Sequence, residues 1–182
     1  MTHPKRNIEL KCRCPDLDAV RHRAQQLGAR DMGVLDQRDT FFQAPLARLK
    51  LRELGHGDAE LISYRRPDQP EARGSDYLIT NVSHPAQLRE VLGHALGASG
   101  VVKKTRRLFL HRNTRIHLDE VEGLGTFVEL ETVLSGQTDS EGLLELQQIA
   151  AALGLNQGES VAEPYVELLR RTRQAFGGGR LR

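Results

Sequence analysis

The sequence is poor in cysteine and aromatic residues and has no long apolar run. It contains two cysteines, no tryptophan, three tyrosines and five phenylalanines among 182 residues. No apolar run approaches the roughly 18 residues of a membrane span, and the first ten residues lack the apolar region of a signal peptide. We therefore expect a cytoplasmic protein with no membrane partner.

An excess of charge of one sign is also lacking. Lysine plus arginine number 26 against 24 aspartate plus glutamate, which gives a net charge of +2. So small an excess provides no general attraction to nucleic acid or to an anionic membrane, and nucleic acid is not expected as a partner. Any strong electrostatic field must be local.

The two cysteines, Cys12 and Cys14, stand two positions apart within a predicted strand. Their side chains point the same way on a segment with little freedom to bend, so we expect no disulfide between them. Buried thiols fit a reducing compartment. A Cys-x-Cys metal site is the alternative interpretation, but the sequence has no further cysteine to complete a thiolate cage.

Turn signals divide the chain into short segments of alternating polarity. They predict about eight strands, over residues 6–13, 33–43, 46–54, 58–66, 75–82, 100–111, 114–121 and 125–134. Helices are predicted over residues 16–27, 85–96, 140–153 and 164–174. Several connections between strands are of hairpin length, so most neighbouring strands should be antiparallel. Residues 67–74 should form an exposed loop, and we expect a single domain over residues 1–176 with a disordered tail over residues 177–182.

Several predicted strands carry charges on one face and apolar side chains on the other. In the first strand, Glu9 and Lys11 alternate with Ile8 and Leu10. The same division holds for further charged pairs: Lys50 and Arg52, Lys104 and Arg106, Arg115 and Asp119, and Glu129 and Glu131. The simplest interpretation is a half-buried sheet whose charged face meets water.

Two features favour charged faces that turn inward. Like charges recur at alternate positions of one strand, about 7 Å apart, whereas a plain solvent-exposed face tends to mix signs. Each predicted helix also has an apolar side, and the apolar strand faces can receive it only if the charged faces point away from the helices. A barrel with a polar lumen satisfies both conditions. A triphosphate with Mg²⁺ is a ligand that would use cationic and carboxylate groups together.

A series of short motifs extends from residue 7 to residue 169. They are Asn7-Ile8-Glu9-Leu10-Lys11, Gln37-Arg38-Asp39-Thr40-Phe41-Phe42, Arg48-Leu49-Lys50-Leu51-Arg52, Tyr64-Arg65-Arg66-Pro67, Val102-Lys103-Lys104-Thr105-Arg106, Arg115-Ile116-His117-Leu118-Asp119-Glu120, Gly125-Thr126-Phe127-Val128-Glu129-Leu130-Glu131 and Pro164-Tyr165-Val166-Glu167-Leu168-Leu169. In this order they resemble the CYTH superfamily of triphosphate tunnel metalloenzymes, and in particular its branch labelled class IV adenylyl cyclase.

The resemblance implies an α+β fold: a closed eight-stranded antiparallel β-barrel with a polar, charged lumen and helices packed outside. It implies metal ligands at Glu9, Glu129 and Glu131, with Asp119 as a weaker candidate, and two bound Mg²⁺ or Mn²⁺ ions. The residues implied to contact phosphate oxygens are Lys11, Lys50, Arg52, Arg65, Lys104, Arg106 and Arg115. The residues implied in catalysis are Glu9, Lys11 and Glu131.

Some positions depart from the family pattern or stay open. Asn7 stands where the family has a glutamate, which removes one anionic ligand from a second metal site. His117 is equally compatible with the lumen and with solvent. Arg66 should alternate to the outer face from Arg65, and Tyr165 should plug the barrel end.

The implied activity is metal-dependent phosphoryl transfer on a nucleoside or organic triphosphate, with conversion of ATP to cyclic AMP and pyrophosphate as the first candidate. A triphosphatase acting on inorganic or thiamine triphosphate is an alternative, although few aromatic side chains are present to stack on thiamine. A non-catalytic binder of triphosphate or polyphosphate is another. Glu129 and Glu131 disfavour it, because carboxylates in an anion site are costly unless metals occupy them. A homodimer is left open.

Overall fold

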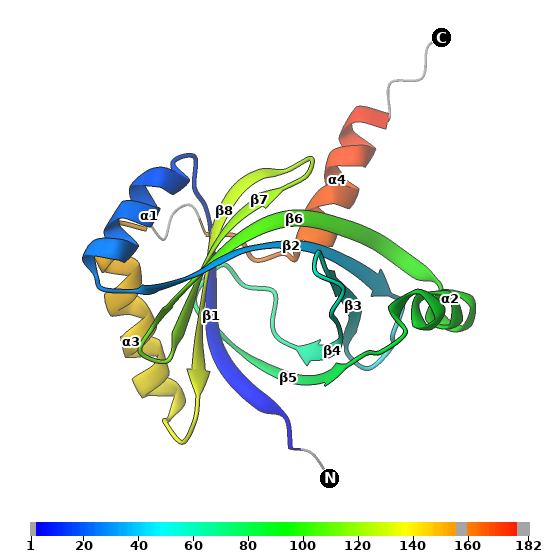
Figure 1. Cartoon of the computed structure of the whole chain (residues 1–182), viewed down its shortest axis with the longest axis horizontal. Coiled ribbons are helices and arrows are strands. Elements are labelled where there is room, and N and C mark those ends of the chain that lie inside the picture. Colours follow the sequence, from blue (N-terminus) through cyan, green and yellow to red (C-terminus); the bar gives the residue numbers. More distant parts are fainter. Residues whose placement is uncertain (1–2, 156–159, 178–182) are drawn as a thin grey trace.

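Eight strands close into one barrel in the computed structural model, which describes residues 3–155 and 160–177 (Figure 1). In spatial order around the barrel, the strands are β1 (Lys5–Arg13), β5 (Arg73–Asn81), β4 (Ala59–Arg65), β3 (Arg48–Leu54), β2 (Arg30–Phe42), β6 (Ala98–His111), β7 (Thr114–Val121) and β8 (Gly125–Leu134). Every neighbouring pair is antiparallel, and β1 closes the barrel by pairing with both β5 and β8. The predicted closed antiparallel barrel is confirmed.

Four helices lie outside the barrel: α1 (Leu17–Gln26), α2 (Pro85–Leu96), α3 (Asp139–Ala152) and α4 (Tyr165–Gly177). Each overlaps a predicted helix. Gly177, which the sequence placed in the tail, is the last residue of α4, and the predicted disorder over residues 178–182 concerns residues outside the described ranges. Among the described residues, no helix is both long and apolar enough to cross a membrane.

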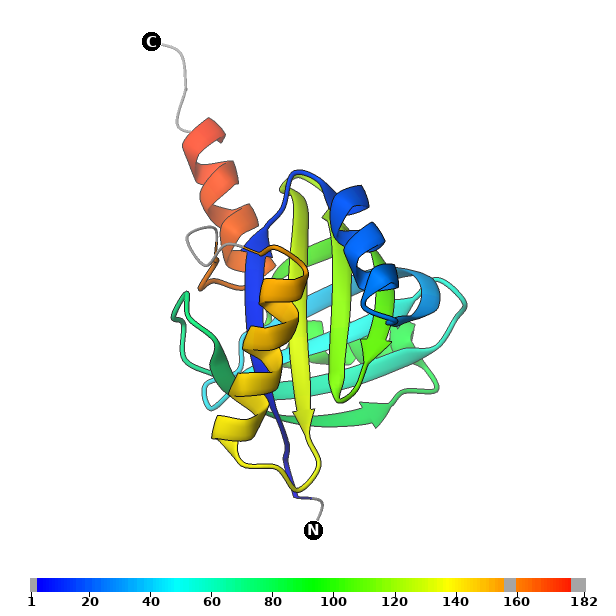
Figure 2. The ribbon, with the colours of Figure 1, turned by 90° about the vertical axis from the view of Figure 1, so that its left-hand side faces the viewer.

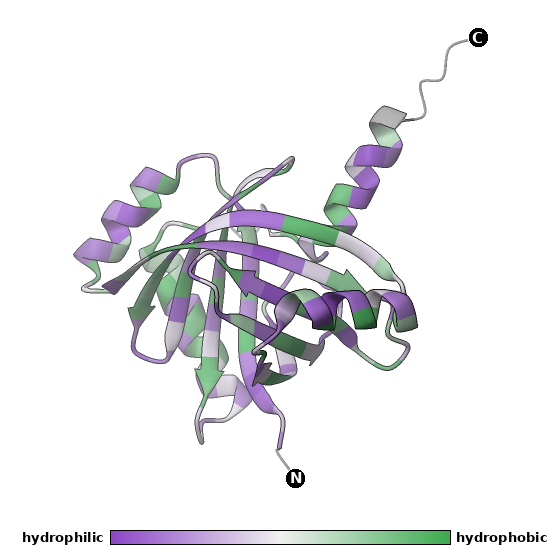
Figure 3. Cartoon of the chain, turned by 45° about the vertical axis from the view of Figure 1, so that its right-hand side comes forward, coloured by the Kyte–Doolittle hydropathy of each residue, from purple (hydrophilic) through white to green (hydrophobic). Residues whose placement is uncertain are grey.

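Helices α1 and α3 cover the outer face of β1, β7 and β8 (Figure 2). Hydrophilic and hydrophobic residues alternate along several strands (Figure 3), and in β1, β7 and β8 apolar side chains face α1 and α3. Ile8 and Leu10 of β1, for example, pack with Ile149 of α3 in one buried cluster. Burial of each such side chain contributes about 1.5–3 kcal/mol. The apolar faces therefore point outward to the helices, and the charged faces point into the barrel.

Helix α2 covers a second part of the barrel wall. Leu88, Leu92 and Leu96 recur every four residues and so lie on one face of the helix. That face packs against Phe42 of β2 and Leu51 of β3. Helix α2 thus covers the end of β2 and part of the outward face of β3, whereas Met32 and Val34 of β2 are exposed.

Helix α4 begins at one end of the barrel. Its first residues, Tyr165 and Val166, pack with Phe41, Val102 and Phe127 in a buried cluster. The rings of Tyr165 and Phe127 meet edge to face, with centroids 4.9 Å apart. Tyr165 is thus buried where α4 meets the barrel, and it also lines the cavity inside; its role as a plug stays a prediction.

Candidate functional site

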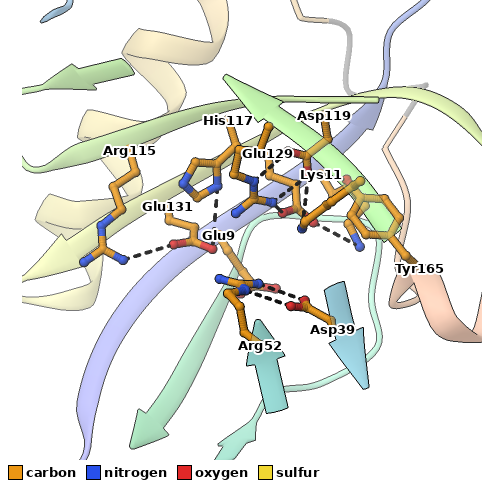
Figure 4. Close-up of polar contacts among 12 residues, drawn as sticks. Glu9, Lys11, Asp39, Arg52, Arg115, His117, Asp119, Glu129, Glu131 and Tyr165 are labelled. Atoms are coloured by element: carbon orange, nitrogen blue, oxygen red, sulfur yellow. Dashed lines mark hydrogen bonds and ion pairs between the residues drawn. The ribbon is translucent and has the colours of Figure 1, made fainter. Parts of the chain in front are cut away.

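A cavity inside the barrel is lined by the inward faces of the strands. Seven basic and four acidic side chains line it: Lys11, Lys50, Arg52, Arg66, Lys104, Arg106, Arg115, Glu9, Asp39, Glu129 and Glu131. Figure 4 shows several of these side chains pointing toward one another from different strands. The excess of cations suits a polyanion, whereas the carboxylates suit a metal cation.

Strand register brings residues far apart in the sequence onto neighbouring positions of the lumen. Glu9 of β1 lies opposite Glu131 of β8, and Lys11 lies opposite Glu129. On the other side of β8, His117 of β7 lies opposite Glu129. Directly opposed residues have Cβ atoms about 4.5–5.5 Å apart, so these five side chains are neighbours in space.

Asp119 is enclosed by hydrogen-bond donors. Arg106 donates to both of its oxygens, from Nε at 2.6 Å and from Nη2 at 2.5 Å, and the Tyr165 hydroxyl donates to Oδ2 at 3.1 Å. Lys104 Nζ lies 3.4 Å from the same oxygen. Burial alone would raise the pKa of Asp119, but the charges of Arg106 and Lys104 hold it below its ordinary value. This carboxylate is therefore ionised and orients the two cations.

Asp39 of β2 likewise accepts hydrogen bonds from an arginine and a lysine. Arg52 donates to both of its oxygens at 2.8 and 2.9 Å, and Lys50 donates to Oδ2 at 2.9 Å. Burial acts to raise the pKa of Asp39, and the two cations hold it well below its ordinary value. For Lys50, burial and the neighbouring Arg52 lower the pKa to about 8, although Asp39 opposes them.

Glu9 contacts two arginines at the far side of the lumen. Its Oε1 lies 3.1 Å from Arg66 Nε and 3.3 Å from Arg73 Nη2. Burial raises the pKa of Glu9, and Arg66 offsets part of that effect. Within the described part of the chain, Arg73 Nε has no hydrogen-bond partner. Arg66 lines the cavity, and Arg73 lies behind Glu9 with donors that are not fully used.

Glu129, Glu131 and His117 form a compact group. One ligand atom from each lies within 4.8 Å of the others. Glu129 contacts Arg106 Nη2 at 2.5 Å and Lys11 Nζ at 3.3 Å. Burial raises the pKa of both glutamates, but neighbouring cations hold that of Glu129 well below its ordinary value and that of Glu131 below it as well. Burial, together with the nearby Arg106, lowers the pKa of His117, so its imidazole is neutral.

The sequence profile of the CYTH domain matches residues 5–165. The chain belongs to the CYTH family. A Methanocaldococcus jannaschii protein named as a proposed adenylate cyclase is 22% identical over 170 residues, which cover 88% of this chain and 97% of the relative.

Two solved structures illustrate the shared CYTH fold. The PH1012 protein of Pyrococcus horikoshii is 26% identical, with a TM-score of 0.82 over 90% of this chain and 99% of the other. A proposed adenylyl cyclase of Hippeastrum, HpAC1, is described as revealing a dominant triphosphatase activity. It is 18% identical, with a TM-score of 0.61 over 91% of this chain and 95% of the other.

Most residues implied by the CYTH resemblance do meet in the cavity. Those that line it are Glu9, Lys11, Lys50, Arg52, Lys104, Arg106, Arg115, Glu129 and Glu131. Asp119 lies behind them, with both oxygens already bound by protein donors. In this arrangement Asp119 has no free oxygen for the metal ion that it was predicted to bind.

The assignment of faces to Arg65 and Arg66 was wrong. Ile62 and Tyr64 of β4 point into the cavity, and alternation carries Arg66 to the same side, where it contacts Glu9. Arg65 lies on the opposite face, is exposed, and donates from Nε to the Leu46 carbonyl at 2.9 Å. Arg66 is thus the cavity residue, and Arg65 is not.

Two further charged residues on the lumen face of the CYTH barrel, Asp39 and Arg73, were not predicted as site residues. Asp39 shares the alternation of β2 with Phe41, and that pattern could have placed it in the lumen. Arg73 fell in the predicted loop over residues 67–74, but it is the first residue of β5 and pairs with Glu9 of β1. No local signal in the sequence reveals this pairing.

The donor groups fit a divalent metal ion, which CYTH proteins generally use. Glu129 and Glu131 offer carboxylate oxygens, and His117 offers a neutral ring nitrogen. Asn7 Oδ1 is buried, faces the same cavity, and has no hydrogen-bond partner within the described ranges. Buried polar atoms without partners are costly, and a bound cation would satisfy them.

Proposed function

We propose that this CYTH protein is a divalent-metal-dependent phosphoryl-transfer enzyme that acts on a nucleoside or other organic triphosphate. The observation that carries the proposal is the cavity in which seven basic and four acidic side chains meet. Guanidinium and ammonium groups bind phosphate oxygens, and carboxylates bind hard divalent cations. The two sets of side chains together complement a triphosphate with its metal.

The carboxylates favour an enzyme over a simple anion binder. Glu9, Glu129 and Glu131 share the cavity with the cations that would hold the phosphates. A carboxylate repels a bound polyanion unless a metal ion lies between them. A protein that only stored or sequestered polyphosphate would bind more tightly without these three side chains.

Oriented arginines supply much of the proposed catalysis. Arg52 and Arg106 are held in place by buried aspartates, and each keeps further N–H donors for phosphate oxygens. Donors fixed in advance stabilise the charge of a transferring phosphoryl group without reorganising. We assign Lys11 to the transferring phosphate, and Glu129 and Glu131 to the metal. When bound, the divalent ion would neutralise charge on the phosphate oxygens.

The first candidate reaction is cyclisation of ATP. The ribose 3′-oxygen would form a bond to the α-phosphorus, the bond from that phosphorus to the bridging oxygen would break, and pyrophosphate would leave while the hydroxyl proton passes to solvent. Phe41, Ile62 and Tyr64 line the same cavity. Lys50 Nζ lies 5.6 Å from the ring centroid of Phe41 and 5.7 Å from that of Tyr64. The two rings therefore offer an apolar surface for a base or sugar directly beside the cations.

Hydrolysis is the second candidate. Water would attack the terminal phosphorus, and the bond to its bridging oxygen would break to release phosphate and a diphosphate. The same cations and carboxylates would serve this reaction, and the activity described for HpAC1 of Hippeastrum motivates it.

A substrate panel separates the candidates. ATP, GTP, thiamine triphosphate and inorganic triphosphate would each be incubated with the protein, with and without Mg²⁺ or Mn²⁺, and products followed by ³¹P NMR. We expect metal-dependent loss of an organic triphosphate, with pyrophosphate and cyclic AMP as the products from ATP. Orthophosphate with diphosphate would establish hydrolysis instead. Binding without turnover of any member of the panel would contradict an enzymatic function.

Adjacent arginines provide a matched pair of variants for the cavity. Arg66→Ala should weaken triphosphate binding by about tenfold or more, because it removes a charge-assisted contact worth about 1.5–3 kcal/mol. Arg65→Ala, at the exposed last residue of β4, should bind as the parent does. Calorimetric titration with inorganic triphosphate measures both, and a larger loss for Arg65→Ala would place the ligand outside the cavity.

A further inference from the structure

His117 has an atom whose position in the lumen is not explained by the protein alone. The residue is 4% exposed, and its Nδ1 has no hydrogen-bond partner in the part of the chain that the structure describes. The nearest carboxylate oxygen, Glu131 Oε1, lies 3.9 Å away, which is too far for a hydrogen bond. A buried ring nitrogen left in this state costs free energy unless something else binds it.

Two glutamates face the same point as this nitrogen. His117 lies directly opposite Glu129 on the paired strands β7 and β8, and Glu131 follows on the same face of β8. One donor atom from each of the three residues lies within 4.8 Å of the other two. Two metal–ligand bonds of about 2.0–2.2 Å each span about 4 Å, so small side-chain rotations would bring all three donors onto one ion.

Glu129 is itself paired with Lys11 Nζ and Arg106 Nη2, so an ion at this point would replace those contacts. The remaining carboxylates of the lumen are also held by cations. Both oxygens of Asp119 accept hydrogen bonds from Arg106, and both oxygens of Asp39 accept from Arg52. Glu9 contacts Arg66 and, more distantly, Arg73. What distinguishes the imidazole is its position: among the described His, Cys, Asp and Glu side chains, His117 is the one with a donor atom within 4.8 Å of both glutamates.

We propose that His117 Nδ1, Glu129 and Glu131 form a mixed nitrogen and oxygen metal site that prefers Mn²⁺, Co²⁺ or Zn²⁺ to Mg²⁺. The proposal rests on the proposed function for its use of a divalent metal and adds which class of ion the site selects. Mg²⁺ takes oxygen ligands almost exclusively, whereas imidazole favours transition metals. One nitrogen donor among the ligands thus shifts selectivity away from Mg²⁺.

Pulsed electron paramagnetic resonance of the Mn²⁺-loaded full chain, without triphosphate, tests for the nitrogen ligand. The wild-type protein should show ¹⁴N coupling to Mn²⁺, and protein labelled with ¹⁵N-histidine should show ¹⁵N coupling in its place. The labelling needs no substitution, so the result does not depend on whether a variant folds. Bound Mn²⁺ without histidine coupling, or no bound Mn²⁺, overturns the proposal.

Substitutions then assign the histidine and the selectivity. His117→Gln should abolish the coupling, and the ratio of Mg²⁺ to Mn²⁺ dissociation constants should fall by about tenfold or more. His94→Gln, an exposed change on α2, should leave both unchanged. Coupling that survives in His117→Gln overturns the assignment.

Turnover measured on the same samples keeps the two proposals apart. Histidine coupling without turnover of any triphosphate would reject the proposed function and retain the metal site. Turnover without histidine coupling would reject the metal site and retain the proposed function.

Discussion

The carboxylates of the lumen differ in how completely the protein satisfies them. The side chains of Asp39 and Asp119 are 3% and 0% exposed, and both oxygens of each accept hydrogen bonds from a guanidinium group. The side chain of Glu131 is 22% exposed, and its nearest cation, Arg115, lies 3.4 Å away. The two aspartates hold cations in place, whereas Glu131 is accessible to a ligand.

This difference predicts that Glu131→Ala folds but does not turn over substrate. The change removes a proposed metal ligand without removing core packing. Loss of a residue that only hydrogen-bonds to a metal ligand typically costs roughly 10–100-fold in activity, so loss of the ligand itself should cost more. The free energy of unfolding should change by less than about 1 kcal/mol. Metal-dependent triphosphate turnover and urea denaturation measure the two effects.

Glu129→Ala is the informative contrast. Its removal leaves Lys11 and Arg106 short of a buried anionic partner, which typically costs about 3–5 kcal/mol. If Glu131→Ala were as unstable as Glu129→Ala, or kept near-parental rates, the distinction between these glutamates would be wrong.

We expect Lys50 to make the proposed triphosphate binding dependent on pH. Burial lowers its pKa to about 8 in the free protein. The ammonium form, present below that pKa, attracts the anion, and bound triphosphate raises the pKa further. We therefore expect affinity to be highest below pH 8 and to fall by about tenfold or more as the pH rises through 8 toward 10.

Lys50→Arg tests this assignment, because an arginine keeps its charge over the whole range. Its affinity should fall less steeply with pH than that of the parent. Part of the slope should remain, because burial also lowers the pKa of Lys11 to about 8. Parallel curves for parent and variant in calorimetric titrations would show that Lys50 does not contact the ligand.

At the scale of elements, alternation separated lumen from helix-covered residues in most strands, although it assigned Arg65 and Arg66 to the wrong faces. The first strand illustrates this, since Glu9 and Lys11 face the cavity and Ile8 and Leu10 face α3. The pattern is local, and sequence displays it directly. Arg73 could not be found in this way, because only its pairing with β1, more than 60 residues earlier, places it in the lumen.

The start of α4 should contribute to stability mainly through ring packing. Tyr165→Phe keeps the contact with Phe127 and loses only the hydroxyl donated to Asp119, which still has Arg106 as a partner. It should cost about 1 kcal/mol. Tyr165→Ala opens a cavity at the barrel end and should cost about 3–5 kcal/mol.

Denaturant unfolding of the two Tyr165 variants provides the comparison. Equal losses for Phe and Ala would mean that the hydroxyl, rather than the ring, holds α4 against the barrel. A smaller m-value in the Ala variant would instead indicate that its native state has already loosened at this end.

At the scale of the whole molecule, the cation-rich lumen should make the barrel more stable when an anion fills it. Inorganic triphosphate at about 100 times its dissociation constant adds about 2.7 kcal/mol to the free energy of unfolding, or about 5–11 °C in melting temperature for a chain of this size. Orthophosphate at the same concentration should shift melting less, because it spans fewer of the cations. Equal shifts in calorimetric scans would contradict a cavity built for a chain of phosphates.

The closed barrel itself could be inferred because two local patterns agree. Strands with one charged face and helices with one apolar side are compatible only if the charges turn inward. The order of strands around the barrel was beyond such reasoning, since β2 pairs with β6 across α2 and three intervening strands. Sequence pattern alone likewise could not decide that Asp119 accepts hydrogen bonds from Arg106 while His117 Nδ1 has no hydrogen-bond partner within the described ranges. Those contacts depend on how far each side chain reaches.

The double pairing of β1 has a consequence for protein synthesis. Glu9 and Lys11 lie on the first barrel strand that the ribosome makes, yet their partners Glu131 and Glu129 lie on the last. About 120 residues separate the two strands, which at 5–20 residues per second is roughly 6–24 s of translation. Until then a nascent chain can hold its cations and carboxylates only as scattered surface charges. The cavity proposed to bind a triphosphate is therefore completed only late, when β8 pairs with β1 and β7.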